Sequence, residues 1–421
     1  MSRGTTRPLV AIAAVVGLAE LGFATVIPLL PLYLKERLGA SATLVGVVVA
    51  AFAAVETVCK TTWGHVADRI GRRPVVVGGL VLASAAPIVM TVLRVPWLFV
   101  PLRLVDGTGS AALWPATAAA IVDRTAANRR ATGMGTLNMF FLSGLALGPS
   151  LGLFVSGAFG SYRAGFYLAS GLLLAAAGLA SLVLGDERAA PAETSGGTPV
   201  PGRGASAWRS VVGTVRASPQ LSAMLAVSFV QMIGVGLLAP ILVIYAHEVV
   251  GLSDQMIGAV FLVVVLAVAA GSIPGGRLAD RVGRARTVVW GMTMASAGMW
   301  LLPAAGRGNL IVLGVAAALL GASYALSSPA WLALMSEAAP PGRTGMVMGA
   351  SETAQGAGLI LGPAFGGALY DRFGPPAPFL ASALLLTAGT ALAIRAVARR
   401  ASARSDGRDR PGHDEGGGGD E

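Results

Sequence analysis

Long apolar stretches, separated by short polar or basic segments, dominate this chain. A helix needs roughly 20 mostly apolar residues to cross the hydrocarbon core of a bilayer. Twelve stretches approach or exceed this length, and charged residues, Pro or Gly mark most of their borders. We therefore predict an all-α membrane protein whose twelve spans lie at residues 9–34, 42–63, 75–93, 97–122, 133–155, 162–184, 221–246, 256–275, 287–303, 309–334, 345–369 and 376–397.

The second half of the chain repeats two motifs of the first half. Gly-x-x-x-Asp-Arg-x-Gly-Arg and Gly-x-x-x-Gly-Pro-x-x-Gly each occur twice, the first at 64–72 and 276–284, the second at 144–152 and 358–366. Parallel repeats of this kind are typical of secondary transporters whose two bundles are related by an axis along the membrane normal. We predict two six-helix bundles with such pseudo-two-fold symmetry, at residues 1–186 and 219–398.

Two segments lie outside these bundles. Residues 187–218 are rich in Pro, Gly, Ser and Thr, which indicates a flexible cytoplasmic linker. A short interfacial helix around Trp208 is an alternative for part of this linker, because Val211, Val212 and Val215 share a helical face with it. Residues 399–421 alternate Arg and Asp before a run of Gly, so we predict a disordered cytoplasmic tail.

The charge of the chain fits a membrane protein. Charged residues make up 12% of the sequence, about half the fraction of a soluble domain, and hydrophobic residues make up 54%. The net charge of +10 would suit nucleic acid, but most of the 31 Lys and Arg lie on the side that holds both termini. Such an excess marks the cytoplasmic side. We therefore expect no nucleic-acid partner, a place in the cell membrane, and both termini in the cytoplasm.

The sequence lacks the motifs of covalent, metal-dependent or ATP-driven chemistry. It has one cysteine, Cys59, and three histidines that are far apart in the sequence. These exclude an intramolecular disulfide and do not form a metal-binding pattern. We find neither a Walker loop nor the spacing of a nucleophile and its base. We therefore expect no cofactor, no bound metal and no enzymatic activity, and a monomer as the functional unit.

The Asp-Arg-x-Gly-Arg loops join the second span to the third and the eighth to the ninth. Glycine permits the sharp turn, and a carboxylate can face the positive end of a neighbouring helix. Such contacts form only when the loop-bearing ends of the bundles meet, so we predict a gate that locks an outward-open state. The alternative is that the arginines only set the topology. The predicted gate comprises Gly64, Asp68, Arg69, Gly71, Arg72, Arg73, Gly276, Asp280, Arg281, Gly283 and Arg284.

These loops resemble the signature cytoplasmic loop of the major facilitator superfamily. The segment from Arg103 to Gly109 resembles a second motif of that superfamily, an arginine before Gly-x-Gly. The Gly-Pro element at 144–152 resembles one associated with its drug/proton antiporter branch, although a full second copy at 358–366 departs from the usual single one. The resemblance covers about residues 10–398, and it implies alternating access of two bundles around a central cavity.

The Gly-Pro elements also have a purely structural interpretation. Glycines four residues apart form a stripe on one helix face, which allows a neighbouring helix to approach closely. A proline in such a helix favours a kink. Packing and antiport are equally compatible with the residues concerned, which are Gly144, Gly148, Pro149, Gly152, Gly358, Gly362, Pro363 and Gly366.

Ionisable side chains lie inside several predicted spans. A charge at mid-bilayer costs about 2.5–3.5 kcal/mol or more, so these groups should face water or pair. Glu56 and Lys60, like Arg103 and Asp106, are spaced to share a helix face. Glu20 has no partner on its own helix, so we predict that it is the first proton site, with Arg103 as its partner across the bundle. Glu352 is a second candidate for the proton or a cationic substrate, and the other predicted cavity residues are Trp114, Asn138, Gln231 and Gln355.

From these features we predict proton-coupled efflux of small amphipathic or cationic organic compounds by alternating access. Met, Phe, Trp and Gln on the predicted cavity faces suit a broad range of substrates, because flexible and aromatic surfaces repack. One alternative is a transporter of a single metabolite or sugar. A more remote alternative is a receptor or scaffold that no longer transports. The expected partners are the lipid bilayer, protons and a small-molecule substrate.

Overall fold

The computed structural model describes residues 3–126, 129–185, 213–216, 218–304, 309–340 and 343–408. Every regular element in this part of the chain is a helix, which confirms the predicted fold class. Nine helical stretches of the described chain are long and apolar enough to cross a membrane. The predicted spans 97–122, 287–303 and 345–369 are helical but are not among these nine, so the count of twelve stays a prediction.

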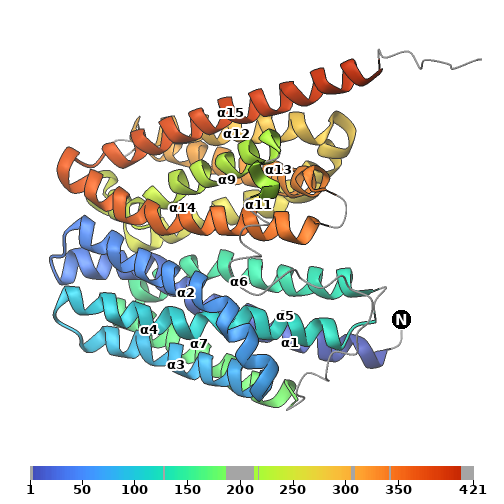
Figure 1. Ribbon diagram of the computed structural model, residues 1–421. Coiled ribbons are helices and arrows are strands. Elements are labelled where there is room, and N and C mark those ends of the chain that lie inside the picture. Colours follow the sequence, from blue (N-terminus) through green and yellow to red (C-terminus); the bar gives the residue numbers. More distant parts are fainter. Residues whose placement is uncertain are drawn as a thin grey trace, which may run out of the picture.

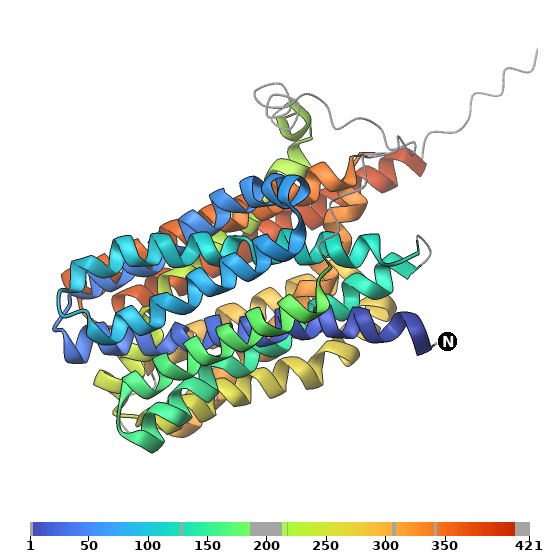
Figure 2. The ribbon, with the colours of Figure 1, turned by 90° about the horizontal axis from the view of Figure 1, so that it is seen from below.

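The helices form two bundles, one above the other in Figure 1. The first contains α1 (Arg3–Leu32), η1 (Tyr33–Arg37), α2 (Ala42–Ile70), α3 (Arg72–Val92), η2 (Pro96–Leu98), α4 (Phe99–Ala111), α5 (Leu113–Asp123), α6 (Arg130–Phe159) and α7 (Tyr162–Val183). The second contains α9 (Pro219–Leu238), α10 (Ile241–Tyr245), η4 (Ala246–Val250), α11 (Asp254–Val282), α12 (Arg284–Leu301), η5 (Leu302–Ala304), α13 (Leu310–Ala338), α14 (Thr344–Phe373) and α15 (Ala377–Arg408). Figure 2 shows the long helices running between the two ends of the molecule.

The structure revises several predicted boundaries. The span at 97–122 is divided into α4 and α5 by a turn at Ala112. The predicted tail from residue 399 begins inside α15, which continues to Arg408, while residues 409–421 lie outside the described chain. Most of the predicted linker, including Trp208, also lies outside the described residues, whereas 213–216 are helical.

The same turn, a glycine with positive φ followed by a capping serine, separates two helices in each half. The π-helical segments η1 and η4 are each followed by a glycine with positive φ, Gly39 at 65° and Gly251 at 80°. Serine side chains then cap the next helices, because Ser41 accepts from the Leu44 N–H of α2 and Ser253 accepts from the Met256 N–H of α11. The sequence repeat is therefore also a repeat of local structure.

The two glycine stripes pack one helix pair in each half. A Cβ atom at Gly144, Gly148 or Gly152 of α6 would collide with the backbone or side chains of α1. The second stripe, at residues 358–366 of α14, approaches α9 equally closely. Close packing, one of the two interpretations of the Gly-Pro elements, is therefore confirmed, and α6 and α14 continue as helices through their prolines.

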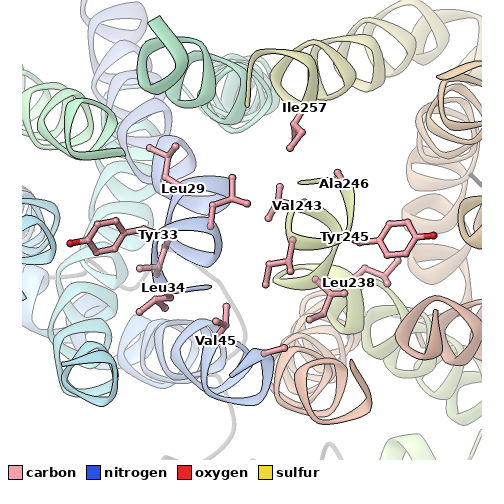
Figure 3. Close-up of a cluster of buried hydrophobic side chains, with 14 of the residues drawn as sticks. Leu29, Tyr33, Leu34, Val45, Leu238, Val243, Tyr245, Ala246 and Ile257 are labelled. Carbon is pink, nitrogen blue, oxygen red and sulfur yellow. The ribbon is translucent and has the colours of Figure 1, made fainter. Parts of the chain in front are cut away.

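Among the described residues, the halves share a hydrophobic core at one end of the molecule. A single buried cluster combines Leu29, Leu34 and Val45 of the first half with Leu238 and Ile257 of the second (Figure 3). The other two buried clusters each lie within one half. We call the end with the shared core, where α1 ends, the joined end, and the opposite end, where α1 begins, the split end. Across the halves, α2 packs against α14 and α6 against α11.

Candidate functional site

A buried ion pair lies in the middle of α4. Arg103 and Asp106 pair as their spacing predicts, and they are 8% and 2% exposed. The Arg103 guanidinium also lies 3.9 Å from the centroid of the Phe52 ring in α2. Arg103 Nε and Asp106 Oδ1 have no hydrogen-bond partner within the described chain. The pair thus retains a buried donor and a buried acceptor that make no hydrogen bond within the described chain.

Glu20 lies beside a second ion pair, in α2. Glu56 and Lys60 are 3.0 Å apart, and the electrostatic partners of Glu20 are these two residues. Arg103 is not one of them, so the predicted partnership between Glu20 and Arg103 is wrong in this conformation. The physical reason is local, because Asp106 lies one turn further along the same helix face as Arg103. Residues of α1, α2 and α4 therefore form one charged cluster within the first half.

The other predicted cavity residues are dispersed. Trp114 packs against Phe141, with ring centroids 5.2 Å apart, and Asn138 and Glu352 are exposed. Gln355 donates to Ser351 of its own helix at 3.1 Å. Gln231 lies against Gly389 of α15, inside the second half, rather than beside the charged cluster. The structure therefore brings Glu20, Glu56, Lys60, Arg103 and Asp106 together, while no ion pair or hydrogen bond among the described residues links the other predicted cavity residues to them.

The predicted gate loops lie at the split end. Gly71 and Gly283 have φ of 100° and 101°, the sharp turns that their sequence predicts. In each half the arginine after this glycine pairs with an acidic residue of the same half, Arg72 with Asp123 and Arg284 with Glu337. Asp68 and Asp280 are exposed. The locking contact between the halves stays a prediction for another conformation.

A polar cluster that the sequence analysis did not find crosses between the halves at the joined end. Tyr162 of the first half donates to Glu36 Oε2 at 2.8 Å and lies 3.4 Å from Asp254 Oδ1 of the second half. His247 Nδ1 lies 3.1 Å from Glu36 Oε1 and 3.6 Å from Asp254 Oδ1. These side chains line a cavity of about 570 Å³. Four separate segments contribute them, so no spacing in the sequence links them.

A second contact across the joined end involves Asp371 of α14. Its carboxylate accepts from the backbone N–H of Ala42 at 3.1 Å and of Thr43 at 2.7 Å, and from the Thr43 hydroxyl at 2.6 Å. Asp371 lies beyond the predicted span 345–369. Burial opposes its ionisation, but these hydrogen bonds and nearby Lys35 hold the pKa of Asp371 below its usual range. An ionised carboxylate therefore caps the positive end of α2.

Comparisons with known proteins agree with this architecture. A family model described as the Major Facilitator Superfamily matches residues 12–230 and 224–415, which together cover most of the chain. The chain belongs to this superfamily. It is therefore a multi-pass membrane transporter and not an enzyme.

The chain is similar to two proteins that are named as multidrug resistance proteins. The chain is 26% identical over 379 residues to multidrug resistance protein MdtG of Serratia proteamaculans, covering 86% of this chain and 87% of the relative. It is 25% identical over 379 residues to multidrug resistance protein 2 of Bacillus subtilis, covering 89% and 92%. Among solved structures, the nucleoside transporter NupG shares the fold with a TM-score of 0.74 at 10% identity, covering 93% of this chain and 98% of that one.

Proposed function

We propose that this transporter is a proton-coupled exporter of small amphipathic or cationic organic compounds in the plasma membrane. The observation that carries the proposal is the charged cluster of Glu20, Glu56, Lys60, Arg103 and Asp106 inside one half. Ionisable groups inside a membrane are costly, and they mark ion and substrate pathways. The names of the two multidrug resistance relatives support the substrate class.

The orientation follows from the basic residues. Most of them lie on the side of the split end, which we assign to the cytoplasm together with both termini. The joined end then faces the outside of the cell. Since the shared core and the cross-half contacts lie at that end, we interpret the structure as an inward-facing state.

Glu20 is our first candidate for the transported proton. In the inward-facing state it exchanges its proton with the cytoplasm, and its ionised form attracts a cationic substrate. Glu56 and Lys60 are the charged neighbours of Glu20, so a change in that ion pair would alter how Glu20 exchanges its proton. One elementary charge that crosses 100 mV supplies about 2.3 kcal/mol, close to fiftyfold in substrate gradient. Asp106 and Glu352 are the further candidates.

The test is proton flux in proteoliposomes that contain the purified monomeric protein and a panel of lipophilic cations and neutral drugs. Glu20→Gln removes the ionisable group without changing its size, and we expect it to abolish substrate-dependent proton movement while substrate still binds. Glu352→Gln is assayed beside it, because this exposed carboxylate is a further candidate, and loss of coupling in Glu352→Gln alone would assign the proton site to Glu352. Unchanged coupling in Glu20→Gln would exclude Glu20 as the proton site.

A narrow-specificity metabolite transporter is the second candidate. The observation in its favour is the fold shared with NupG, which is named as a nucleoside transporter. Adding nucleosides and sugars to the same panel separates the two functions, because a dedicated transporter moves one of these compounds and none of the drugs. Movement of no compound at all would favour a receptor or scaffold.

A further inference from the structure

We infer that His247 is a pH-sensitive latch, whose protonated form closes the joined end by holding carboxylates from both halves. The inference rests on the proposed orientation, in which the joined end faces the outside of the cell. It adds a second titratable group to the proposed function, at a site remote from Glu20. It would tie the pH outside the cell to the conformation of the transporter.

The geometry makes the contact depend on the charge of the imidazole. His247 Nδ1 lies 3.1 Å from Glu36 Oε1, across the boundary between the halves, and 3.6 Å from Asp254 Oδ1. Nδ1 does not reach good hydrogen-bond geometry with either carboxylate in the described chain, and its contact with Asp254 is more electrostatic than hydrogen-bonding. A neutral ring therefore gains little from these neighbours. A protonated ring attracts both carboxylates, because the attraction between charges needs no precise alignment.

The carboxylates themselves favour opening when this charge is absent. Glu36 belongs to the first half and Asp254 to the second, and the Tyr162 hydroxyl lies within 2.8 Å of one and 3.4 Å of the other. The Tyr162 hydroxyl has one proton to donate, so the negative charges of Glu36 and Asp254 repel each other across the boundary between the halves. Loss of the imidazolium charge would thus turn a contact that joins the halves into one that separates them.

The remaining charged groups around the imidazole do not replace it. Arg37 of η1 lines the same cavity, but no ion pair of this residue with Glu36 or Asp254 occurs among the described contacts. Glu248 of η4 accepts from Tyr370 at 2.8 Å, and Lys35 lies 5.8 Å from the centre of that tyrosine ring. Of the groups at this cluster, histidine is the type that changes charge between pH 5 and 8.

The direction of the effect suits an exporter. Acid outside the cell protonates His247 and favours the closed joined end, which is the inward-facing state. That is the transition an antiporter makes after it has released substrate outside and taken up a proton. Alkaline medium removes the latch and favours the outward-open state. The switch would thus couple the return step to the same proton gradient that drives export.

The test measures the opening of the joined end directly. In a Cys59→Ser background, spin labels are placed by Trp97→Cys and Phe373→Cys, positions that are 61% and 67% exposed and lie on opposite halves at this end. Distances between the labels are recorded at pH 5.5 and pH 8. We expect the closed-to-open ratio to be about fivefold higher at pH 5.5, as for a partly exposed ion pair of about 1 kcal/mol.

Variants assign this response to His247. His247→Gln should give the same ratio at both pH values, and His247→Arg should hold the closed population at both. Glu36→Gln should also remove the response. His65→Gln is the control, because His65 lies in α2 at the opposite end of the molecule, where its ring nitrogen is 2.8 Å from the Thr61 carbonyl of the same helix. An acid response that survives in His247→Gln, or that is lost in His65→Gln, would overturn the inference.

This measurement is independent of the proposed transport activity. It requires only the folded protein and no substrate. Absent proton flux together with an intact pH response would count against the proposed function alone. Normal proton-coupled efflux without a pH response of the label distance would count against the latch alone.

Discussion

Asp371, at the end of α14, accepts three hydrogen bonds from the first turn of α2, two of them from Thr43. The two residues belong to different halves, so the cap exists only while the joined end is closed. Capping of a helix by a carboxylate is worth about 1 kcal/mol. The contact is therefore strong enough to shift a balance between two conformations, yet weak enough to break in each cycle.

We predict that Asp371→Ala shifts the balance between closed and open joined ends about fivefold toward the open state. The reason is the loss of the α2 cap, and the label distance at the joined end measures it. Because the folded pKa of Asp371 is depressed, its stabilising effect is present above the unfolded pKa and is lost only in strong acid. The shift should hence be equal at pH 5.5 and pH 8. Arg372→Gln, which changes the exposed neighbouring side chain, should leave the balance unchanged.

Removing one member of the buried pair in α4 should destabilise the protein severely. Asp106→Ala leaves the buried Arg103 charge without its ion-pair partner, at a cost of about 3–5 kcal/mol. We expect a lower melting temperature in detergent and poor recovery of folded protein. The double variant Arg103→Met, Asp106→Leu removes both charges and should recover most of the stability but no transport. If the double variant also transported, the pair would have only a structural role.

A side chain at Gly148 should separate α6 from α1. The nearest atoms to a Cβ at this position are those of Ala24 and the Leu21 carbonyl, and backbone cannot move aside as a side chain can. Gly148→Val is expected to lower the melting temperature by several degrees and to abolish efflux. Gly135→Val is the matched control, because a Cβ there meets nothing within 4 Å in the described structure. Equal effects of the two variants would contradict this account of the stripe.

A substitution at Asp68, in the loop at the split end, should lower the rate of efflux and leave the affinity for substrate unchanged. Asp68 is exposed here, and its predicted contacts form only in the outward-open state. We therefore expect Asp68→Asn to slow efflux about tenfold while the affinity for substrate in the inward-facing state is retained. Efflux kinetics and equilibrium binding of a fluorescent drug separate these quantities. Weaker binding with unchanged turnover would refute the gate.

The sequence predicted those features that depend on local spacing. Apolar length predicts the spans, glycines four residues apart predict the close helix pairs, and the spacing of Arg103 and Asp106 predicts their pairing. The partner of Glu20 was mispredicted, because contacts between helices depend on rotation and crossing angle, which one helix's pattern does not define. The same limit applies to Gln231, whose side chain lies against Gly389 of α15 and not beside the charged cluster.

The polar cluster at the joined end could not be predicted from spacing in the sequence. Glu36, Tyr162, His247 and Asp254 come from four segments, and each has an unremarkable neighbourhood in the sequence. One signal was available in retrospect. Gly39 and Ser41 recur as Gly251 and Ser253, so both halves build the same turn directly after these polar residues. A repeated turn beside charged residues marks a place where the two halves can meet.

The paired glycine stripes have a mechanical consequence. Since α1 lies against α6, and α9 against α14, with no space for even a methyl group, neither pair can slide. Each bundle therefore rotates as a rigid body, and the proposed latch and the Asp371 cap lie at one end of it. A small change there is therefore carried along the full length of the helices: forming these contacts opens the split end, and breaking them opens the joined end.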